Sequence, residues 1–327
     1  MAAVSEYPQP AIVDLRRVRS IELEELLAEE IGLWERRLDW DYRPSADLVR
    51  RYVRMQSLGG CALLVGHRVA GYSYWVTEEQ KGLIGDLYVS RDLPHHSDFE
   101  MRLLDATLGV LWNTPLIRRV ESQLMMLSDE SRQRVRCRRE VGSVTRIFMT
   151  LDIRRVPRLE ESAAAGAFLF DRWHERDQEH TARLIARSYM NHPDSAINDQ
   201  YRSLAGARRF LTNVVQYPGC GSFFSPGSLV ATDPITGRVA GACLASLVAF
   251  DVGHITQICV DPERQGTRLG YELLRQSLLA LVWAGVRKVS LTVTSSNEQA
   301  LRLYRQVGFE PLTSFDAFVW DPERRLA

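Results

Sequence analysis

A glycine-containing turn lies between a predicted strand and a predicted helix in the second half of the chain. The strand ends at Val260, the helix begins at Leu269, and the turn contains Gln265 and Gly266. The start of a helix presents backbone N–H groups that have no partner inside the helix, and the helix dipole makes this end positive. Gly266 and Gly270 have no Cβ atom, so the backbone can approach a ligand closely. These residues predict a binding site for a phosphorylated ligand.

A tyrosine lies on the apolar face of a later predicted helix, residues 297–307. That face has the i, i+3, i+4, i+7 spacing of residues that pack into a core, and it consists of Ala300, Leu303, Tyr304 and Val307. A tyrosine in such a position can bury its ring and still offer its hydroxyl group. Tyr304 is therefore either a packing residue or a proton donor.

The elements that position these residues follow from hydrophobic periodicity and turn signals. In the second half we expect helices and strands in the order β-α-α-β-β-β-α-β-α-β-β. The strands are expected at 167–173, 228–232, 238–249, 254–260, 288–294, 309–312 and 314–320, and the helices at 178–190, 204–216, 269–284 and 297–307. Ser295 and Glu298 form a capping box that begins the last helix, and Gly308 ends it.

The first half of the chain repeats this order from residue 11 to residue 153. Residues 82–89 match residues 253–260, which lie 171 positions later, and Trp112 matches Trp283 at the same spacing. Several such matches in one order predict a tandem duplication. We therefore expect two domains, at 1–155 and 167–327, joined by a polar linker rich in alanine and glycine at 156–166.

Composition excludes several classes of protein. The 327 residues carry 41 basic and 41 acidic side chains, and a net charge of zero argues against a nucleic-acid-binding protein. No apolar run is long enough to cross a membrane, and the first ten residues lack the pattern of a signal peptide. The five cysteines form no CxxC pair, so we expect neither a disulfide framework nor a metal site. We expect a cytoplasmic monomer or homodimer, and the 39 arginines against 2 lysines are typical of a GC-rich bacterial genome.

Two segments of the second half, on the expected elements, resemble motifs of the GCN5-related N-acetyltransferase (GNAT) family. One is the turn at 260–270, and the other is Asn297-x-x-Ala300-x-x-x-Tyr304-x-x-x-Gly308-Phe309. The resemblance covers the second half closely and the first half by element order. It implies an α/β (α+β) protein with two tandem GNAT-like domains, each a mixed, mostly antiparallel central sheet flanked by helices. It also implies direct transfer of an acetyl group from acetyl-CoA to a primary amine of a small molecule or peptide.

The resemblance assigns the cofactor site to the turn and the strand before it. The pyrophosphate of acetyl-CoA would bind the turn, and the pantetheine arm would pair with the backbone of the strand, so Cys259 needs no role as a nucleophile. Where the family has glycine this chain has Arg268, and we expect it to be an ordinary first-turn helical residue that adds a cation near phosphate. The implied cofactor-binding residues are Ile258, Cys259, Val260, Arg264, Gln265, Gly266, Thr267, Arg268, Leu269, Gly270 and Asn297, the last of which could alternatively only cap its helix.

Transfer to an amine needs a base and an acid. An alkyl ammonium with a pKa near 10.4 must lose its proton, which costs about 4–5 kcal/mol at pH 7, and the departing thiolate must gain one. His254 lies six residues before Val260, where some family members carry a glutamate base, and Tyr304 lies where the family has its acid. The alternatives are a histidine bonded to a backbone carbonyl, with a water relay as the base, and a tyrosine that only packs.

The resemblance places the acceptor over the first two helices of the domain and the loop between them. This loop is dense in polar and aromatic side chains, and Asp194 or Asp199 could hold a cationic amine; a solvated loop is the alternative. The candidate acceptor-binding residues are Tyr189, His192, Asp194, Asn198 and Tyr201.

The first half lacks the corresponding chemistry. The repeat places residues 94–99, which include no glycine, opposite the phosphate turn, and Asp98 there would repel phosphate. A second match, of Val141-Gly142 with Val307-Gly308 at a spacing of 166, places Arg138 opposite Tyr304, and arginine cannot act as an acid near neutral pH. We expect a degenerate copy that packs on the active domain.

Other functions also fit parts of the sequence. A module that senses acyl-CoA or binds a partner would keep the phosphate turn but would need neither Tyr304 nor His254. The two-domain layout also resembles mycothiol synthase, which acetylates a glucosamine-linked cysteine. A dinucleotide-binding protein is disfavoured, because GxGxxG is absent and three consecutive strands precede the turn.

Overall fold

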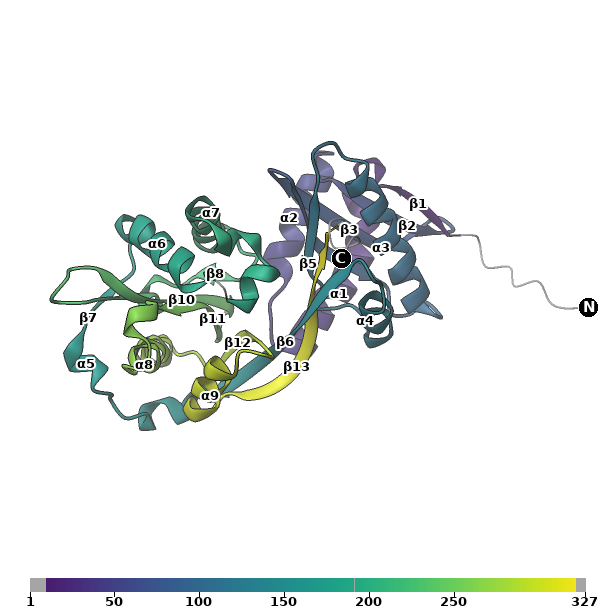
Figure 1. The fold of residues 1–327 in the computed structure, drawn as a ribbon. Helices are drawn as coiled ribbons and strands as arrows, with labels where there is room; N and C mark the ends of the chain where they lie inside the picture. The colour runs from purple at the N-terminus through teal and green to yellow at the C-terminus, as the bar shows by residue number, and fades with distance from the viewer. Residues whose placement is uncertain (1–9, 191, 322–327) are drawn as a thin grey trace, which may run out of the picture. The chain divides into compact units, whose positions relative to one another are not determined.

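The computed structural model describes residues 10–190 and 192–321 (Figure 1). The chain divides into two compact units, of which the first ends at Val144 and resumes at Phe315, and the second is Thr145–Ser314. Both divisions fall inside strands, namely β6 (Val141–Asp152) and β13 (Glu310–Trp320). This division differs from the domain boundaries proposed from the sequence. Residues 1–9, where the signal-peptide pattern was sought, lie outside the described residues.

The first unit contains a mixed sheet in the order β1-β2-β3-β4-β5-β13, in which β4 and β5 are parallel and the other pairs are antiparallel. The C-terminal part of β13 supplies the last strand by pairing with β5. The strands are β1 (Ala11–Asp14), β2 (Gly60–Val65), β3 (Arg68–Glu78), β4 (Lys81–Val89) and β5 (Arg119–Gln123). The helices are α1 (Glu24–Leu38), α2 (Arg43–Arg54), α3 (His96–Trp112) and α4 (Asp129–Arg136).

The second unit contains a sheet in the order β6-β12-β11-β10-β9-β7, in which β11 and β12 are parallel and β8 pairs with β10. The strands are β7 (Leu169–Arg172), β8 (Ser222–Phe223), β9 (Leu229–Thr232), β10 (Val239–Ala249), β11 (Val252–Val260) and β12 (Lys288–Thr294). The helices are α5 (Ala164–Ala167), α6 (Gln178–Ser188), α7 (Leu204–Gln216), α8 (Leu269–Trp283) and α9 (Glu298–Val307).

Helices cover both faces of the sheet in the second unit. α6 and α7 lie on one face and α8 on the other (Figure 1). Leu211 of α7 packs with Ala242 and Leu244 of β10, whereas Leu274 of α8 packs with Cys243 of the same strand. Alternate side chains of β10 therefore pack into two separate cores, one on each face of the sheet. The predicted fold class, a mixed and mostly antiparallel sheet flanked by helices, is confirmed.

Three local expectations were wrong. Residues 156–166 are not a free linker, because Val156 and Ala164 are fully buried in the core beside α8. The two final strands form one continuous strand, β13. The cap of α9 is Asn297 and not Ser295: the Asn297 side chain accepts a hydrogen bond from the Ala300 N–H at 3.1 Å.

Replacing Trp320 with alanine tests whether the C-terminal strand completes the first unit. Trp320 is 2% exposed and packs in the core that surrounds α3, so we expect the free energy of unfolding to fall by about 3–5 kcal/mol. Trp283→Ala is the control, because Trp283 is 88% exposed and its loss should change stability by less than about 0.5 kcal/mol. Urea titration followed by circular dichroism measures both. Equal effects of the two substitutions would contradict this packing.

Candidate active site

Strands β11 and β12 separate part-way along the sheet of the second unit. Their parallel pairing runs from Val252 to Ile255 on β11 and ends, among the described residues, where Ile255 lies opposite Leu291. Both strands continue past this point, β11 to Val260 and β12 to Thr294. The separation opens a strand edge to a cavity of about 470 Å³, which lies between the ends of the two strands, the start of α8 and one side of α9.

A bulge in β11 sets which side chains face this cavity. Ile255 lies opposite Ala245 of β10 and Gln257 lies opposite Leu244, so Thr256 is an extra residue. A bulge shifts the alternation of the residues that follow it. Ile255 consequently packs on the side of α8, while Gln257 reaches the side of α6 and α7. There the Gln257 amide donates to the Tyr189 hydroxyl at 2.8 Å and accepts from that of Tyr201 at 3.3 Å.

The structure brings most of the sequence-predicted site residues together around the cavity. Those that line it are Tyr189, His192, Asp194, Tyr201, Ile258, Cys259, Val260, Arg264, Gln265, Gly266, Arg268, Leu269, Gly270, Asn297 and Tyr304. Thr267, Asn198 and His254 are not among the lining residues. The Thr267 hydroxyl donates to the Arg264 carbonyl at 2.7 Å, and the Asn198 side-chain oxygen accepts from the Gln200 N–H at 3.1 Å. Both side chains therefore form hydrogen bonds within local turns.

The turn before α8 is built from two residues in the left-handed region. Gly266 has φ +80°, and Arg268, the N-cap of α8, has φ 63°. The expectation that Arg268 is an ordinary first-turn residue was therefore wrong. A left-handed non-glycine residue costs roughly 1–2 kcal/mol, and the Arg268 guanidinium, 5.0 Å from the Tyr271 ring centre, offsets part of it. His95 takes the same conformation at the N-cap of α3 in the first unit.

Tyr304 projects from α9 into the cavity. Its side chain is 6% exposed, and its ring packs against Phe309 with the ring centres 6.0 Å apart. Burial raises the pKa of the Tyr304 hydroxyl above its usual value near 10, so the hydroxyl stays protonated at neutral pH. The ring packs in the core and the residue also lines the cavity, so its position is compatible with both interpretations drawn from the sequence.

His254 lies deeper in the sheet. Its Nδ1 atom is 2.9 Å from the Ser290 hydroxyl oxygen on β12, and its ring stacks on Phe148 of β6 at 6.1 Å. Burial, and secondarily the positive charge of Arg146, lower the pKa of His254 to about 4. The histidine is therefore neutral at pH 7 and bonded within the sheet.

A polar network forms the end of the cavity opposite the phosphate turn. Asp194 accepts a hydrogen bond from the Thr294 hydroxyl, and its Oδ2 atom lies 3.4 Å from Nη1 of Arg146. The Asp194 N–H donates to Nδ1 of His192 at 3.1 Å, and the Asn297 amide nitrogen lies 3.1 Å from Nε2 of the same ring. Asn297 thus caps α9 and also lines the cavity.

Sequence reasoning missed Arg146 and Gln257. Arg146 lies on β6, before the proposed second domain, and carries no motif. Gln257 faces the cavity only because of the bulge at Thr256, and a bulge leaves no clear signal in one sequence. The polar and aromatic side chains of the loop after α6 were the sequence signal that indicated this end of the cavity.

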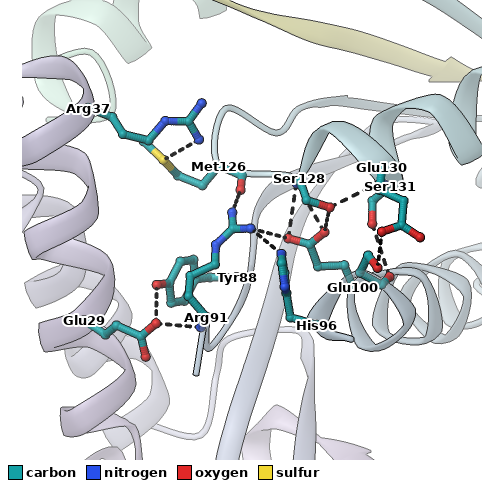
Figure 2. Close-up of polar contacts among 11 residues, drawn as sticks. Glu29, Arg37, Tyr88, Arg91, His96, Glu100, Met126, Ser128, Glu130 and Ser131 are labelled. Atoms are coloured by element: carbon teal, nitrogen blue, oxygen red, sulfur yellow. Dashed lines mark hydrogen bonds and ion pairs between the residues drawn. The ribbon is translucent and has the colours of Figure 1, made fainter. Parts of the chain in front are cut away.

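The corresponding region of the first unit is filled by its own side chains (Figure 2). The Arg91 guanidinium donates to the Met126 carbonyl, and its Nη1 atom lies 2.7 Å from His96 Nε2 and 3.6 Å from Glu100 Oε1. The Ser128 N–H donates to the same Glu100 carboxylate at 3.2 Å. A carboxylate and an internally paired arginine therefore lie by the start of α3, the place where the second unit has its glycine turn.

The helix caps also change the residue that corresponds to Tyr304. Ser128 caps α4 and Asn297 caps α9 through the same side-chain contact to the backbone N–H three residues later. Aligning these caps places Val135 opposite Tyr304, whereas the sequence comparison gave Arg138. Val135 is fully buried and has no ionisable group, so the first unit still offers no acid at this position.

Comparison with known proteins supplies the family. Residues 197–309, which include the turn, α9 and most of the residues that line the cavity, match the model of the acetyltransferase (GNAT) family. Over this segment, about a third of the chain, the protein matches the GNAT family. A mycothiol acetyltransferase from Thermobifida fusca is 32% identical to it over 158 residues, which is 46% of this chain and 45% of that protein. The match thus spans slightly less than half the length of the curated relative.

Solved structures of GNAT proteins share the fold over nearly the whole chain. A GCN5-related N-acetyltransferase from Sphaerobacter thermophilus has a TM-score of 0.69 at 16% identity and covers 95% of both chains. A tandem GNAT protein from the clavulanic acid biosynthesis pathway has a TM-score of 0.59 at 13% identity, covering 96% of this chain and 98% of that one. These likenesses confirm the tandem GNAT architecture.

Residues 10–190 and 192–321 contain neither a membrane-spanning helix nor a metal-binding cluster. No helix there is long and apolar enough to cross a membrane. No group of three or more histidine, cysteine, aspartate or glutamate side chains in the described residues could hold a metal ion.

Replacing His254 with asparagine tests its burial through the pH dependence of stability. The pKa is about 4 in the fold and near 6.5 in the unfolded chain, so between these values only the unfolded chain binds the proton. The stabilisation is complete above pH 6.5 and is lost as the pH falls toward 4. We expect the free energy of unfolding to fall between pH 7 and pH 4.5 in both proteins, and to fall by about 2–3 kcal/mol less in His254→Asn than in the wild type. Urea unfolding at the two pH values measures this difference.

The control for this comparison is His67→Asn, because His67 is exposed. This variant should lose as much stability as the wild type between the two pH values. If His254→Asn also follows the wild type, His254 is not buried as described.

Proposed function

We propose that the second unit transfers an acetyl group from acetyl-CoA to a primary amine of a small molecule or peptide. The single observation that carries the proposal is one cavity that joins the glycine turn, the open edge of β11 and the Tyr304 hydroxyl. The turn can bind phosphate, the strand edge can pair with an amide-bearing arm, and the hydroxyl can donate a proton to a leaving thiolate.

The residues around the turn fit the anionic end of acetyl-CoA. Backbone N–H groups at the start of α8 have no partner in the helix, and Gly266 presents no Cβ atom. Arg264, Arg268 and Arg302 line the cavity and supply positive charge. Arg264 is held by Asp233, whose Oδ2 atom lies 2.6 Å from Nη2.

The open edge of β11 fits the pantetheine arm. The arm carries amide groups, and the backbone from Thr256 to Val260 has no strand partner on the β12 side among the described residues. An extended ligand can pair with such an edge as an added strand does. Side-chain identity is unimportant for this contact, so Cys259, whose thiol pKa is raised by burial, serves as a packing residue.

The reaction moves one proton off the amine and one onto sulfur. The neutral amine nitrogen attacks the thioester carbon, an N–C bond forms, the C–S bond breaks, and the thiolate takes the proton of the Tyr304 hydroxyl. A general acid or base typically contributes 10²–10⁴-fold to such a step. Tyr304 is placed for this role because its hydroxyl is protonated and its side chain lines the cavity.

The proton of the amine leaves toward Asp194, directly or through water. Asp194 is the carboxylate among the described lining residues, and it faces the end where the acceptor would enter. Both ring nitrogens of His192 already have close neighbours, at 3.1 Å each. The sequence-based proposal of His254 as the base has less support, since it does not line the cavity and its Nδ1 atom lies 2.9 Å from the Ser290 hydroxyl oxygen inside the sheet.

The alternatives differ from this proposal at Tyr304 and at the acceptor. A sensor of acyl-CoA would keep the phosphate turn and would not depend on the Tyr304 hydroxyl. A mycothiol-synthase-like activity would use the same donor chemistry with a cysteine amine as the acceptor. The likeness of slightly less than half of the chain to mycothiol acetyltransferases supports this narrower option.

Binding of acetyl-CoA to the turn is tested by Gly266→Asp. The substitution places a carboxylate and a strained φ where phosphate would bind, so the thermal shift caused by acetyl-CoA should disappear. At 100 times the dissociation constant the wild type should gain about 2.7 kcal/mol. NAD and ATP serve as ligand controls and should produce no comparable shift.

The matched control is Gly285→Asp. Gly285 also has a positive φ, of +77°, with open space around it, but it follows the far end of α8. The control should lose similar stability and keep the shift with acetyl-CoA. If Gly266→Asp also keeps the shift, or the wild type shows none at millimolar acetyl-CoA, the cofactor does not bind at this turn.

Replacing Tyr304 with phenylalanine separates an enzyme from a sensor. We expect kcat to fall about 100-fold or more because the thiolate loses its proton donor, while the dissociation constant for acetyl-CoA stays within about threefold. Thiol release and calorimetric titration measure the two quantities. Tyr88→Phe in the first unit is the control and should leave both unchanged. Unchanged turnover in Tyr304→Phe would remove the tyrosine from the mechanism.

A further inference from the structure

We infer that Arg146 selects acceptors in which a carboxylate lies next to the reacting amine, that is, free α-amino acids. The inference rests on the proposed acetyl transfer and names the substrate class of the same cavity. It starts from an arginine that neither the sequence motifs nor the family match assigned, because residue 146 precedes the matched segment at 197–309.

Arg146 enters the cavity from the side of the sheet. It lies on β6 opposite Thr294, the last residue of β12, and its side chain is 13% exposed. It lines the cavity together with Tyr189, Tyr201 and Asp194. Arg146 therefore lies at the end where the acceptor would bind, away from the glycine turn.

The guanidinium of Arg146 has more hydrogen-bond donors than partners. Its Nε atom is buried and has no hydrogen-bond partner in the described part of the chain. Its Nη1 atom makes two long contacts, 3.3 Å to the Thr294 hydroxyl and 3.4 Å to Asp194 Oδ2. A buried, charged donor without a partner is unfavourable, and a planar guanidinium is best satisfied by two oxygens of one carboxylate.

The neighbouring charge sets the spacing that a ligand must match. Asp194 lies 3.4 Å from Arg146, so a negative and a positive group meet the ligand side by side. A ligand that pairs with both side chains must carry its ammonium and its carboxylate as close to each other as Asp194 and Arg146 are. One carbon separates these groups in an α-amino acid. Asp194 would hold and deprotonate the amine while Arg146 holds the carboxylate.

The cations at the other end of the cavity do not replace Arg146. Arg264 and Arg268 belong to the turn before α8, and Arg302 lies on α9. Arg264 and Arg268 would face the phosphates of the cofactor, whereas the Arg302 guanidinium lies 3.5 Å from Glu298 on the exposed side of its own helix. Arg146 is the remaining arginine among the described lining residues, so a carboxylate on the acceptor depends on it.

The test compares acceptors that differ only in the carboxylate. The full chain is incubated with acetyl-CoA and a pool of the 20 common L-amino acids, or with a pool of their α-amides, and thiol release is followed. We expect the wild type to use the amino acids at least tenfold better than the amides. In Arg146→Met, kcat/KM for the best amino acid should fall about 30-fold or more, and for its amide by less than about threefold.

Two further variants keep the test decisive. Arg146→Lys keeps the charge and loses the planar guanidinium. Its kcat/KM for the best amino acid should therefore lie between the values of the wild type and Arg146→Met. Arg154→Met, at an exposed arginine just after β6, should behave as the wild type. If Arg146→Met does not fold, the inference is tested by the ratio of kcat/KM for the amino acid to kcat/KM for its amide, measured in the wild type and in Arg146→Lys.

Failure of the inference is distinguishable from failure of the acetyl-transfer proposal. Equal use of amino acids and amides, equal losses for both in Arg146→Met, or no thiol release with amino acids overturns the role of Arg146. Acetylation of amides or of other amines, such as aminosugars, would leave the acetyltransferase proposal intact. Absence of acetyl-CoA binding in the thermal shift would overturn the proposed function itself.

Discussion

The separation of β11 from β12 after the Ile255–Leu291 pair is the constraint on which the site depends. Buried backbone N–H and C=O groups need partners, and an internal strand that loses its neighbour must find them in water or in a ligand. The sheet therefore presents an interior strand edge to a cavity instead of closing it. The start of α8 and one side of α9 border the same opening. The groups that we propose to bind phosphate, to hold the pantetheine arm and to donate a proton meet there for this reason.

The bulge at Thr256 links this opening to the end of the cavity where we propose that the acceptor binds. Without the extra residue, Gln257 would point to the side of α8. With it, Gln257 holds the hydroxyls of Tyr189 and Tyr201, whose rings stack with their centres 4.2 Å apart. One irregular residue in a strand thus fixes the aromatic wall of the proposed acceptor site.

The sequence predicted the features that have local signals. Gly266 marks a turn, Tyr304 marks an apolar helix face, and the polar loop after α6 marks the acceptor end. It could not predict that Arg268 is left-handed, because the conformation is imposed by the turn and an arginine does not favour it. Nor could it predict the division inside β6 and β13, or the role we infer for Arg146, because strand membership is decided by pairing between residues far apart in the sequence.

Amide hydrogen exchange with and without acetyl-CoA tests the central claim most directly. If the open edge of β11 and the start of α8 hold the cofactor, exchange should slow at residues 256–260 and 266–270. The matching segments of the first unit are 85–89 by the repeat and 93–97 by alignment of the N-caps His95 and Arg268. They should be unchanged, because the side chains around Arg91 already fill that region. Protection in the first unit, or none along β11, would contradict the account.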